Sequence, residues 1–345
     1  MFKFFLFPTI FLLSYCGVEW FRRWSLRRKL FDVPNERSSH TMPTPLGGGL
    51  IIVLISLAAY TLHAVFIAEN FAWAYVLGAI LIALVSWLDD LYTVSIVWRF
   101  SVHAFAAILV IKYIGYFDET YIPFLQAMSQ GKIVGAAITF LWLVWMTNAY
   151  NFMDGIDGIA AAQAVTAGIG WLLVGNLLGS TSAEFYSGVL AFSCLGFLMQ
   201  NWQPARIFMG DVGSAFLGFS FAALPLLAGK EMSAALENRR FLPFAAVALV
   251  WLFVFDTIYT FFRRAANGEK VWEAHRGHLY QKFVAAGFSH RLTAGLYGLI
   301  SVLTVLATIL WISWRGAWQP LLIFLLGFQS VSLLIVLSIV QKKKR

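Results

Sequence analysis

The chain has 345 residues and a net charge of +8; 60% of its residues are hydrophobic and only 12% are charged. Soluble domains carry roughly 25% charged residues, so the composition excludes an ordinary soluble protein and predicts an integral membrane protein. The two cysteines, Cys16 and Cys194, lie in apolar runs, which excludes a disulfide framework and a cysteine-based zinc site.

Apolar runs follow one another along almost the whole chain. A helix needs about 20 apolar residues to cross a bilayer core, and about eleven runs approach that length. They lie near residues 4–20, 46–66, 71–88, 100–115, 132–147, 158–178, 186–200, 213–229, 241–262, 294–314 and 319–340. Arginines follow the first run in place of a small-residue cleavage site, so it is not a signal peptide. We therefore expect an all-α polytopic membrane protein with a single integral membrane domain over residues 1–345.

Basic residues are divided unevenly between the two sides of the predicted bundle. If the loops alternate between sides, one side holds only seven of the 25 basic residues: Lys3, Lys112, Lys132, Lys230, Arg239, Arg240 and Arg315. Cytosolic loops carry the excess of Lys and Arg, which predicts an external N-terminus and a cytosolic C-terminus. The positive charge would attract anionic lipids or an anionic soluble substrate. Nucleic acid is not expected, because the basic residues are spread over short loops.

Polar clusters fall in the five loops predicted on the cytosolic side, which span residues 21–45, 89–99, 148–157, 201–212 and 263–293. Asp89 and Asp90 end an apolar run, where the helix dipole repels carboxylates. Two adjacent acids there indicate a neighbouring cation or a protonated member, and a divalent metal held near phosphates would supply the charge. The alternative is an ordinary solvated helix end.

The segment 148–158 adds further oxygen atoms after the next cytosolic helix end. Asn148, Asn151 and Asp154 could bind a metal or a substrate, and the nearby glycines, Gly155 and Gly158, would let the backbone approach a ligand closely. Asp157 directly precedes a predicted helix. It could bind substrate, or it could simply cap that helix.

Asp211 also precedes a predicted helix, in a loop that contains Asn201, Gln203 and Arg206. Helix capping and metal ligation are both open for Asp211. A glycine-flanked helix start presents free N–H groups suited to phosphate.

The first cytosolic loop contains Arg37 and His40, which are candidate phosphate contacts, although its three prolines also fit a rigid connector. The residues 47–49, all glycines, would allow close packing where the chain re-enters the membrane.

The last cytosolic loop carries His275, Arg276 and His278. The two histidines could share a helix face and bind a metal. We favour phosphate contacts, because the other candidate ligands are oxygens, which suit magnesium. Asp256 lies inside an apolar run, where it would face protein or a water-filled cleft, or else form a structural ion pair with Arg or Lys.

Three other histidines, His63, His103 and His290, have no comparable neighbours in the sequence. We expect them to be structural.

These motifs resemble the polyprenyl-phosphate N-acetylhexosamine-1-phosphate transferases, of the glycosyltransferase family 4 type. The resemblance runs from the Asp32–Arg37 motif to His278 and is most specific at residues 89–90, 148–158 and 208–214. It implies a multi-pass enzyme of the bacterial inner (cytoplasmic) membrane. Its substrates would be a UDP-linked N-acetylated sugar and undecaprenyl phosphate, its cofactor magnesium, and its products UMP and a lipid-diphosphate sugar.

By the same resemblance, Asp89 and Asp90 match the catalytic acidic pair, and Asp211 matches the magnesium ligand with Asn151 beside it. Asp154 and Asp157 match the acids of the nucleotide-sugar loop. Glycine at position 277 departs from the His-x-His-His pattern of many relatives. That departure resembles the subgroup that initiates O-antigen and so lipopolysaccharide synthesis, and it leaves the sugar undetermined.

Direct attack by the lipid phosphate is our expected mechanism, with a phospho-aspartyl intermediate as the alternative. A cation- or proton-coupled transporter would also place acids among many helices. Here, however, all but Asp256 gather on one predicted face, which favours the enzyme. A non-catalytic lipid-binding scaffold is a third reading, and the resemblance leaves a homodimer open.

Overall fold

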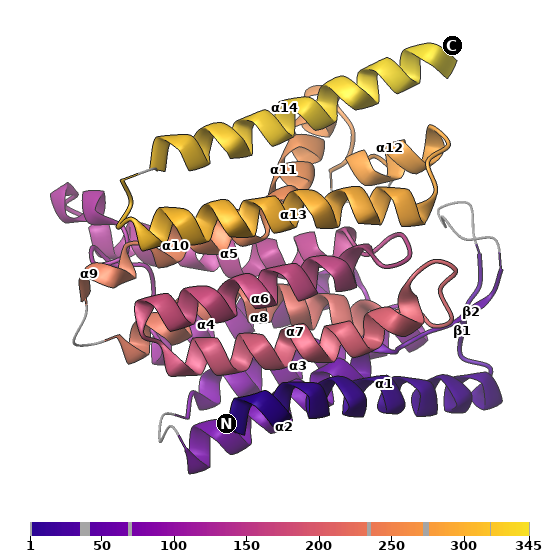
Figure 1. Cartoon of the computed structure of the whole chain (residues 1–345), viewed down its shortest axis with the longest axis horizontal. Coiled ribbons are helices and arrows are strands. Elements are labelled where there is room, and N and C mark those ends of the chain that lie inside the picture. Colours follow the sequence, from indigo (N-terminus) through magenta and orange to yellow (C-terminus); the bar gives the residue numbers. More distant parts are fainter. Residues whose placement is uncertain are drawn as a thin grey trace.

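The computed structural model describes residues 2–34, 42–67, 71–232, 236–271, 276–317 and 319–344 as a bundle of long helices (Figure 1). Its helices are α1 (Phe2–Arg28), α2 (Gly49–Phe66), α3 (Trp73–Tyr92), α4 (Ile96–Tyr113), the 3₁₀ helix η1 (Pro123–Ala127), α5 (Gly131–Phe152), α6 (Ile159–Leu178), α7 (Thr181–Asn201), α8 (Asp211–Glu231), α9 (Leu236–Arg239), α10 (Leu242–Leu249), α11 (Trp251–Ala266), α12 (Leu279–Ala285), α13 (His290–Ser313) and α14 (Gln319–Lys344). Two short strands, β1 (Phe31–Asp32) and β2 (Thr44–Pro45), pair antiparallel.

The helices confirm an all-α polytopic membrane protein. Within the described residues, nine helices are long and apolar enough to cross a membrane, and the bent pair α10–α11 adds a tenth candidate. Helix α1 has 27 residues, which at 1.5 Å per residue exceeds a bilayer core of about 30 Å. With α1 included, these helices correspond to the eleven or so apolar runs of the sequence.

The two ends of the chain lie toward opposite ends of the helices (Figure 1). Helices α1 and α14 both run from left to right in this view, so the C-terminal end of α14 lies at the same end as β1 and β2. This arrangement is the one that an odd number of spans produces. Which compartment each end faces stays a prediction.

Helix α8 forms the centre of the bundle, and its whole membrane-length window is buried. Small residues let neighbouring backbones approach it closely. A Cβ added to Gly218 would lie 2.4 Å from the Met146 carbonyl oxygen of α5, and one added to Gly213 would lie 2.7 Å from Gly49 Cα of α2. The close packing predicted for residues 47–49 is therefore confirmed at Gly49, and it fixes the N-terminal end of α8 against α2.

The predicted run 241–262 is two helices, because the chain bends by 68° between α10 and α11. Val250 has φ −120° and ψ 23°, outside the helical range. A break at membrane depth needs partners for the freed backbone groups. Gln163 supplies one, because its Nε2 donates to the Leu249 carbonyl oxygen at 2.8 Å while Ser301 Oγ donates to its Oε1 at 2.7 Å.

Candidate active site

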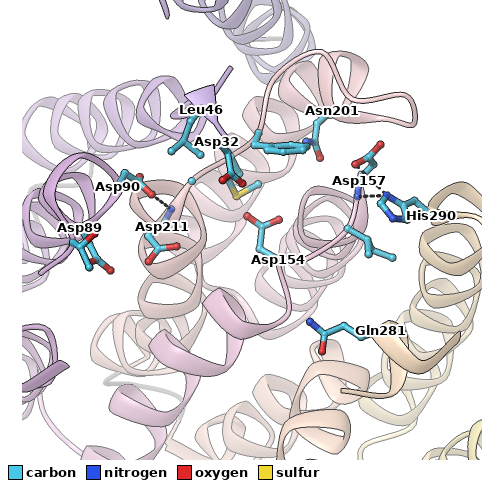
Figure 2. Close-up of a pocket in the computed structure, with 16 residues that line it drawn as sticks. Asp32, Leu46, Asp89, Asp90, Asp154, Asp157, Asn201, Asp211, Gln281 and His290 are labelled. Atoms are coloured by element: carbon cyan, nitrogen blue, oxygen red, sulfur yellow. Dashed lines mark hydrogen bonds and ion pairs between the residues drawn. The ribbon is translucent and has the colours of Figure 1, made fainter. Parts of the chain in front are cut away.

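A cavity of about 450 Å³ lies at the end of the bundle that carries β1 and β2. Residues from all five loops that the sequence places on one side line it. Figure 2 shows Asp89, Asp90 and Asp211 on one side of the cavity and Asp157 with His290 on the other. Six of the lining residues are aspartates: Asp32, Asp89, Asp90, Asp154, Asp157 and Asp211.

Asp90, at the end of α3, caps the N-terminus of α8. Its carboxylate oxygens accept hydrogen bonds from the backbone N–H of Asp211 at 2.8 Å and of Val212 at 3.2 Å. These oxygens satisfy two of the backbone N–H groups that have no partner within the first turn of a helix. Asp211 therefore does not cap its own helix, as one reading of the sequence allowed; it is the first residue of α8, and its N-cap is Gly210.

Arg99, on α4, is a cation beside Asp89, whereas the sequence had predicted either a neighbouring cation, with a divalent metal favoured, or a protonated member of the Asp89–Asp90 pair. Its Nη1 donates to Asp89 Oδ2 and also to Asp211 Oδ2, the latter at 3.2 Å. The second oxygen of Asp89 accepts from the Val94 N–H at 2.6 Å. One guanidinium thus ties the end of α3 to the start of α8.

Backbone hydrogen bonds hold the segment before Asp211 in place. The Phe208 N–H donates to the Pro45 carbonyl at 2.8 Å, and the Gly48 N–H donates to the Phe208 carbonyl at 2.9 Å. The first loop therefore positions the start of α8, even though Asp211 lies far along the chain from it.

Asp154 lies between the two acidic groups in the view of Figure 2. It is half-buried and lines the cavity. Burial raises the pKa of Asp154 well above its ordinary value, and the charges of Asp211, Asp90 and Asp157 raise it further. The protonated form is therefore favoured until a cation enters the cavity.

Asp157 is fixed by two partners on other elements. Its Oδ2 accepts from the Ala205 N–H at 3.1 Å, and its Oδ1 lies 3.2 Å from His290 Nδ1 at the start of α13. The capping alternative for Asp157 is wrong, because α6 starts after Gly158 without a side-chain cap. His290, which the sequence led us to expect as a structural residue, lines the cavity beside Asp157.

Asp256 is fully buried and organises the last loop. Its carboxylate accepts from the Leu279 N–H at 2.9 Å, from the Tyr280 N–H at 3.2 Å and from the Tyr297 hydroxyl at 3.1 Å. The ring of His278 lies 3.1 Å away. Asp256 thus caps α12 and contacts His278. It faces protein, which was one of the two predicted environments, and the predicted alternative of an Arg or Lys partner is wrong.

Helix α12 is joined to the Asp154 loop by Tyr280, whose hydroxyl donates to the Phe152 carbonyl at 3.0 Å. A Cβ on Gly155 would lie 2.2 Å from that hydroxyl oxygen. Position 155 therefore needs glycine, because the Tyr280 hydroxyl leaves no space there for a Cβ atom.

The remaining predicted residues lie around the cavity lining but not in it. Asn151 Nδ2 donates to Ser214 Oγ at 3.1 Å, and Asn148 Nδ2 donates to the Val144 carbonyl at 2.7 Å. Arg206 pairs with Glu19 of α1 at 3.2 Å. His278 and the exposed Arg276 are also outside the lining. Arg37, His40 and His275 fall outside the described residues.

Four residues that the structure places at or beside the cavity were not among the predicted site residues: Asp32, Arg99, Gln281 and His290. Asn201, which also lines the cavity, was noted in the sequence only as a neighbour of Asp211. Arg99 is the one basic residue of the loop 89–99, so the search for a cation near Asp89 could have found it. Asp32 begins the motif at which the family resemblance starts, whereas Gln281 and His290 carry no comparable local signal.

The donor set fits magnesium only in part. Among the residues that the structure describes, no three acidic, histidine or cysteine side chains could hold a metal ion by themselves. Magnesium, however, is usually held by one or two carboxylates, with waters and substrate phosphates completing its shell. Asp211, whose side chain is 36% exposed beside the cavity, suits that partial role. The amide nitrogen of Asn151 is used by Ser214, so a cation would contact its amide oxygen.

The fold and the cavity define a polytopic membrane protein with an aspartate-lined cavity at one end of its helices. Residues 72–229 match the model of glycosyl transferase family 4. A probable undecaprenyl-phosphate N-acetylglucosaminyl 1-phosphate transferase of Bacillus subtilis (strain 168) is 31% identical over 299 residues, which cover 85% of this chain and 82% of that protein. The chain belongs to the polyprenyl-phosphate N-acetylhexosamine-1-phosphate transferase family, which is a family of enzymes.

Two further relatives also match over most of the chain. A decaprenyl-phosphate N-acetylglucosaminephosphotransferase of Mycolicibacterium smegmatis is 28% identical over 306 residues, 82% of this chain and 75% of that protein. A phospho-N-acetylmuramoyl-pentapeptide-transferase of Staphylococcus carnosus is 25% identical over 289 residues, 78% of this chain and 85% of that protein.

Proposed function

We propose that this protein transfers an N-acetylhexosamine 1-phosphate from a UDP-sugar to undecaprenyl phosphate in the bacterial cytoplasmic membrane. The products are UMP and a lipid-linked sugar diphosphate, which starts a surface polysaccharide of the O-antigen kind. N-Acetylglucosamine is the first sugar to test, because the relatives from Bacillus and Mycolicibacterium carry it in their names.

The observation that carries this proposal is the convergence of aspartates from distant loops on one cavity at the end of an apolar bundle. So many carboxylates repel one another unless a cation is bound among them. A cavity at the edge of the membrane can also receive a soluble nucleotide sugar and a lipid phosphate together. Both features support a transfer reaction between two phosphorylated substrates.

Magnesium is the cofactor we propose, with Asp211 as its carboxylate ligand and Asn151 beside it. When bound, magnesium would neutralise the charge of the diphosphate and of the incoming lipid phosphate.

In the proposed reaction, an oxygen of the lipid phosphate attacks the phosphorus that bears the sugar. The bond from that phosphorus to UMP breaks, so one diphosphate linkage replaces another. Catalysis then needs positioning and charge neutralisation more than a strong base. A phosphate monoester is mostly dianionic at neutral pH, since its second proton leaves near pH 6. Both oxygens of Asp89 already accept hydrogen bonds, and we assign it an orienting role.

The test is a transfer assay with purified protein, undecaprenyl phosphate, magnesium and a panel of UDP-sugars, read by the mass of the lipid product. We expect a lipid-diphosphate sugar and stoichiometric UMP. Asp211→Asn should lower the rate by at least about 100-fold, the scale of losing a group that stabilises transition-state charge. Wild-type protein that forms no lipid product with any sugar of the panel would refute the proposal.

The direct-attack mechanism has its own test. Incubating the enzyme with labelled UMP and UDP-sugar, but without lipid phosphate, should give no exchange of label. Exchange under these conditions would instead support a phospho-aspartyl intermediate.

A further inference from the structure

Arg99 lies between two carboxylates that belong to different helices. A single nitrogen, Nη1, contacts Asp89 Oδ2 at the end of α3 and Asp211 Oδ2 at the start of α8. The arginine side chain is only 24% exposed. Charges enclosed in this way interact more strongly than charges on an open surface.

The two contacts of Arg99 are not equivalent. Asp89 is 11% exposed and is also held through its other oxygen by the Val94 N–H. Asp211 is 36% exposed, and its oxygen lies 3.2 Å from the guanidinium. Asp89 is therefore the firmly held partner, and Asp211 is the partner that can turn toward a ligand in the cavity.

The side chains around Arg99 carry more negative than positive charge when they are ionised, so a further cation could bind among them. Asp90 is occupied as the cap of α8 and does not pair with Arg99 in any contact between described residues. When they are ionised, the three carboxylates of Asp89, Asp90 and Asp211 and the one guanidinium carry two net negative charges. One divalent cation neutralises that charge.

We propose that Arg99 is a built-in counter-ion and positioning residue: it stays on Asp89 and gives up Asp211 when the divalent cation of the proposed function binds. In the empty cavity, Arg99 holds Asp211 near Asp89 against their mutual repulsion. Since guanidinium and metal compete for Asp211, Arg99 sets the cation concentration at which the site fills. This inference rests on the proposed function, because that function supplies the cation.

The experiment follows the thermal unfolding midpoint of the purified full-length chain in detergent, without substrates, as magnesium is added at constant ionic strength. Arg99→Gln should unfold at a lower temperature than wild type without magnesium, because Asp89 and Asp211 then repel one another. Its midpoint should rise at a magnesium concentration about tenfold lower than wild type needs, because a nearby positive charge has been removed.

Two further variants control the measurement. Arg23→Gln removes a basic residue that pairs with Glu19 and is absent from the cavity lining, so its magnesium response should equal that of wild type. Arg99→Lys keeps the charge but shortens the reach to Asp211. Its response should lie between those of wild type and Arg99→Gln, and it tests the inference if the glutamine variant does not fold.

An Arg99→Gln variant that responds at the wild-type magnesium concentration, or at a higher one, overturns the inference. The same holds for an Arg99→Lys variant that needs more magnesium than wild type. Failure of the proposed function is distinguishable, because it appears in the transfer assay of the wild-type protein as an absence of lipid product.

Discussion

Replacing Gly210 with alanine should destabilise the protein through a contact with Asp90. Gly210 has φ +78° and ψ 164°, a backbone conformation essentially confined to glycine, which costs another residue about 1–3 kcal/mol. An added Cβ would also lie 2.6 Å from Asp90 Oδ2. Moving that carboxylate away removes the cap of α8, worth about 1 kcal/mol. Together these effects predict a loss of about 2–4 kcal/mol in the free energy of unfolding.

The assay is reversible unfolding of the purified protein in mixed micelles, with Gly179→Ala as the matched control. Gly179 also has positive φ, +80°, but no described atom lies within 4 Å of its added Cβ, so only a backbone cost of about 1 kcal/mol is expected. In an Asp90→Ala background, Gly210→Ala should cost at least about 1 kcal/mol less, because the clashing carboxylate is gone. Equal costs for the two glycine variants, with no change in that background, would refute the reasoning.

Three further predictions concern the same end of the bundle. Burial raises the pKa of Asp154 in the folded protein, so the protonated side chain's contribution to stability is lost as the pH rises above its pKa in the unfolded chain, about 4. Asp154→Asn should therefore raise the thermal unfolding midpoint at pH 7.5 and change it little near pH 4.5. An equal shift at both pH values would contradict this. Asp256→Asn leaves buried hydrogen-bond donors facing an amide group and should lower the free energy of unfolding by about 3–5 kcal/mol. Tyr297→Phe removes only one of these donors and should lower it by about 1 kcal/mol. Equal losses for the two variants in an unfolding titration would exclude a special role for the carboxylate. Gly155→Ala should cost about 1–3 kcal/mol by overpacking against the Tyr280 hydroxyl, and combining it with Tyr280→Phe should recover part of that loss; purely additive free energies would rule out the contact.

Much of the site could be predicted because the polar motifs stand at the ends of apolar runs. Asp89, Asp90, Asp154, Asp157 and Asp211 all line the cavity, as their shared side of the membrane suggested. Their individual partners could not be predicted. Local rules assign a cap to the residue just before a helix, yet α8 and α12 are capped by Asp90 and Asp256 from other helices.

The start of α7 combines both kinds of cap: Ser180, just before the helix, accepts from the Ala183 N–H at 3.3 Å, and Glu231 at the end of α8 accepts from the Ser182 N–H at 3.0 Å. In each of these three cases a carboxylate from a distant part of the chain satisfies the first amides of a helix. Only the lateral arrangement of the helices brings such a carboxylate within reach, so a sequence window cannot reveal it.

By itself, the sequence determined that this chain is a helical membrane protein whose polar site residues lie at one end of the helices. Apolar runs of bilayer length must form helices that satisfy their own backbone, and charged residues are then confined to the helix ends. The tertiary structure alone decided that Arg99 also contacts Asp211 of α8 and that the chain bends at Val250. It also placed His290 against Asp157. These contacts depend on which helices pack side by side, and no periodic pattern along the chain encodes that choice.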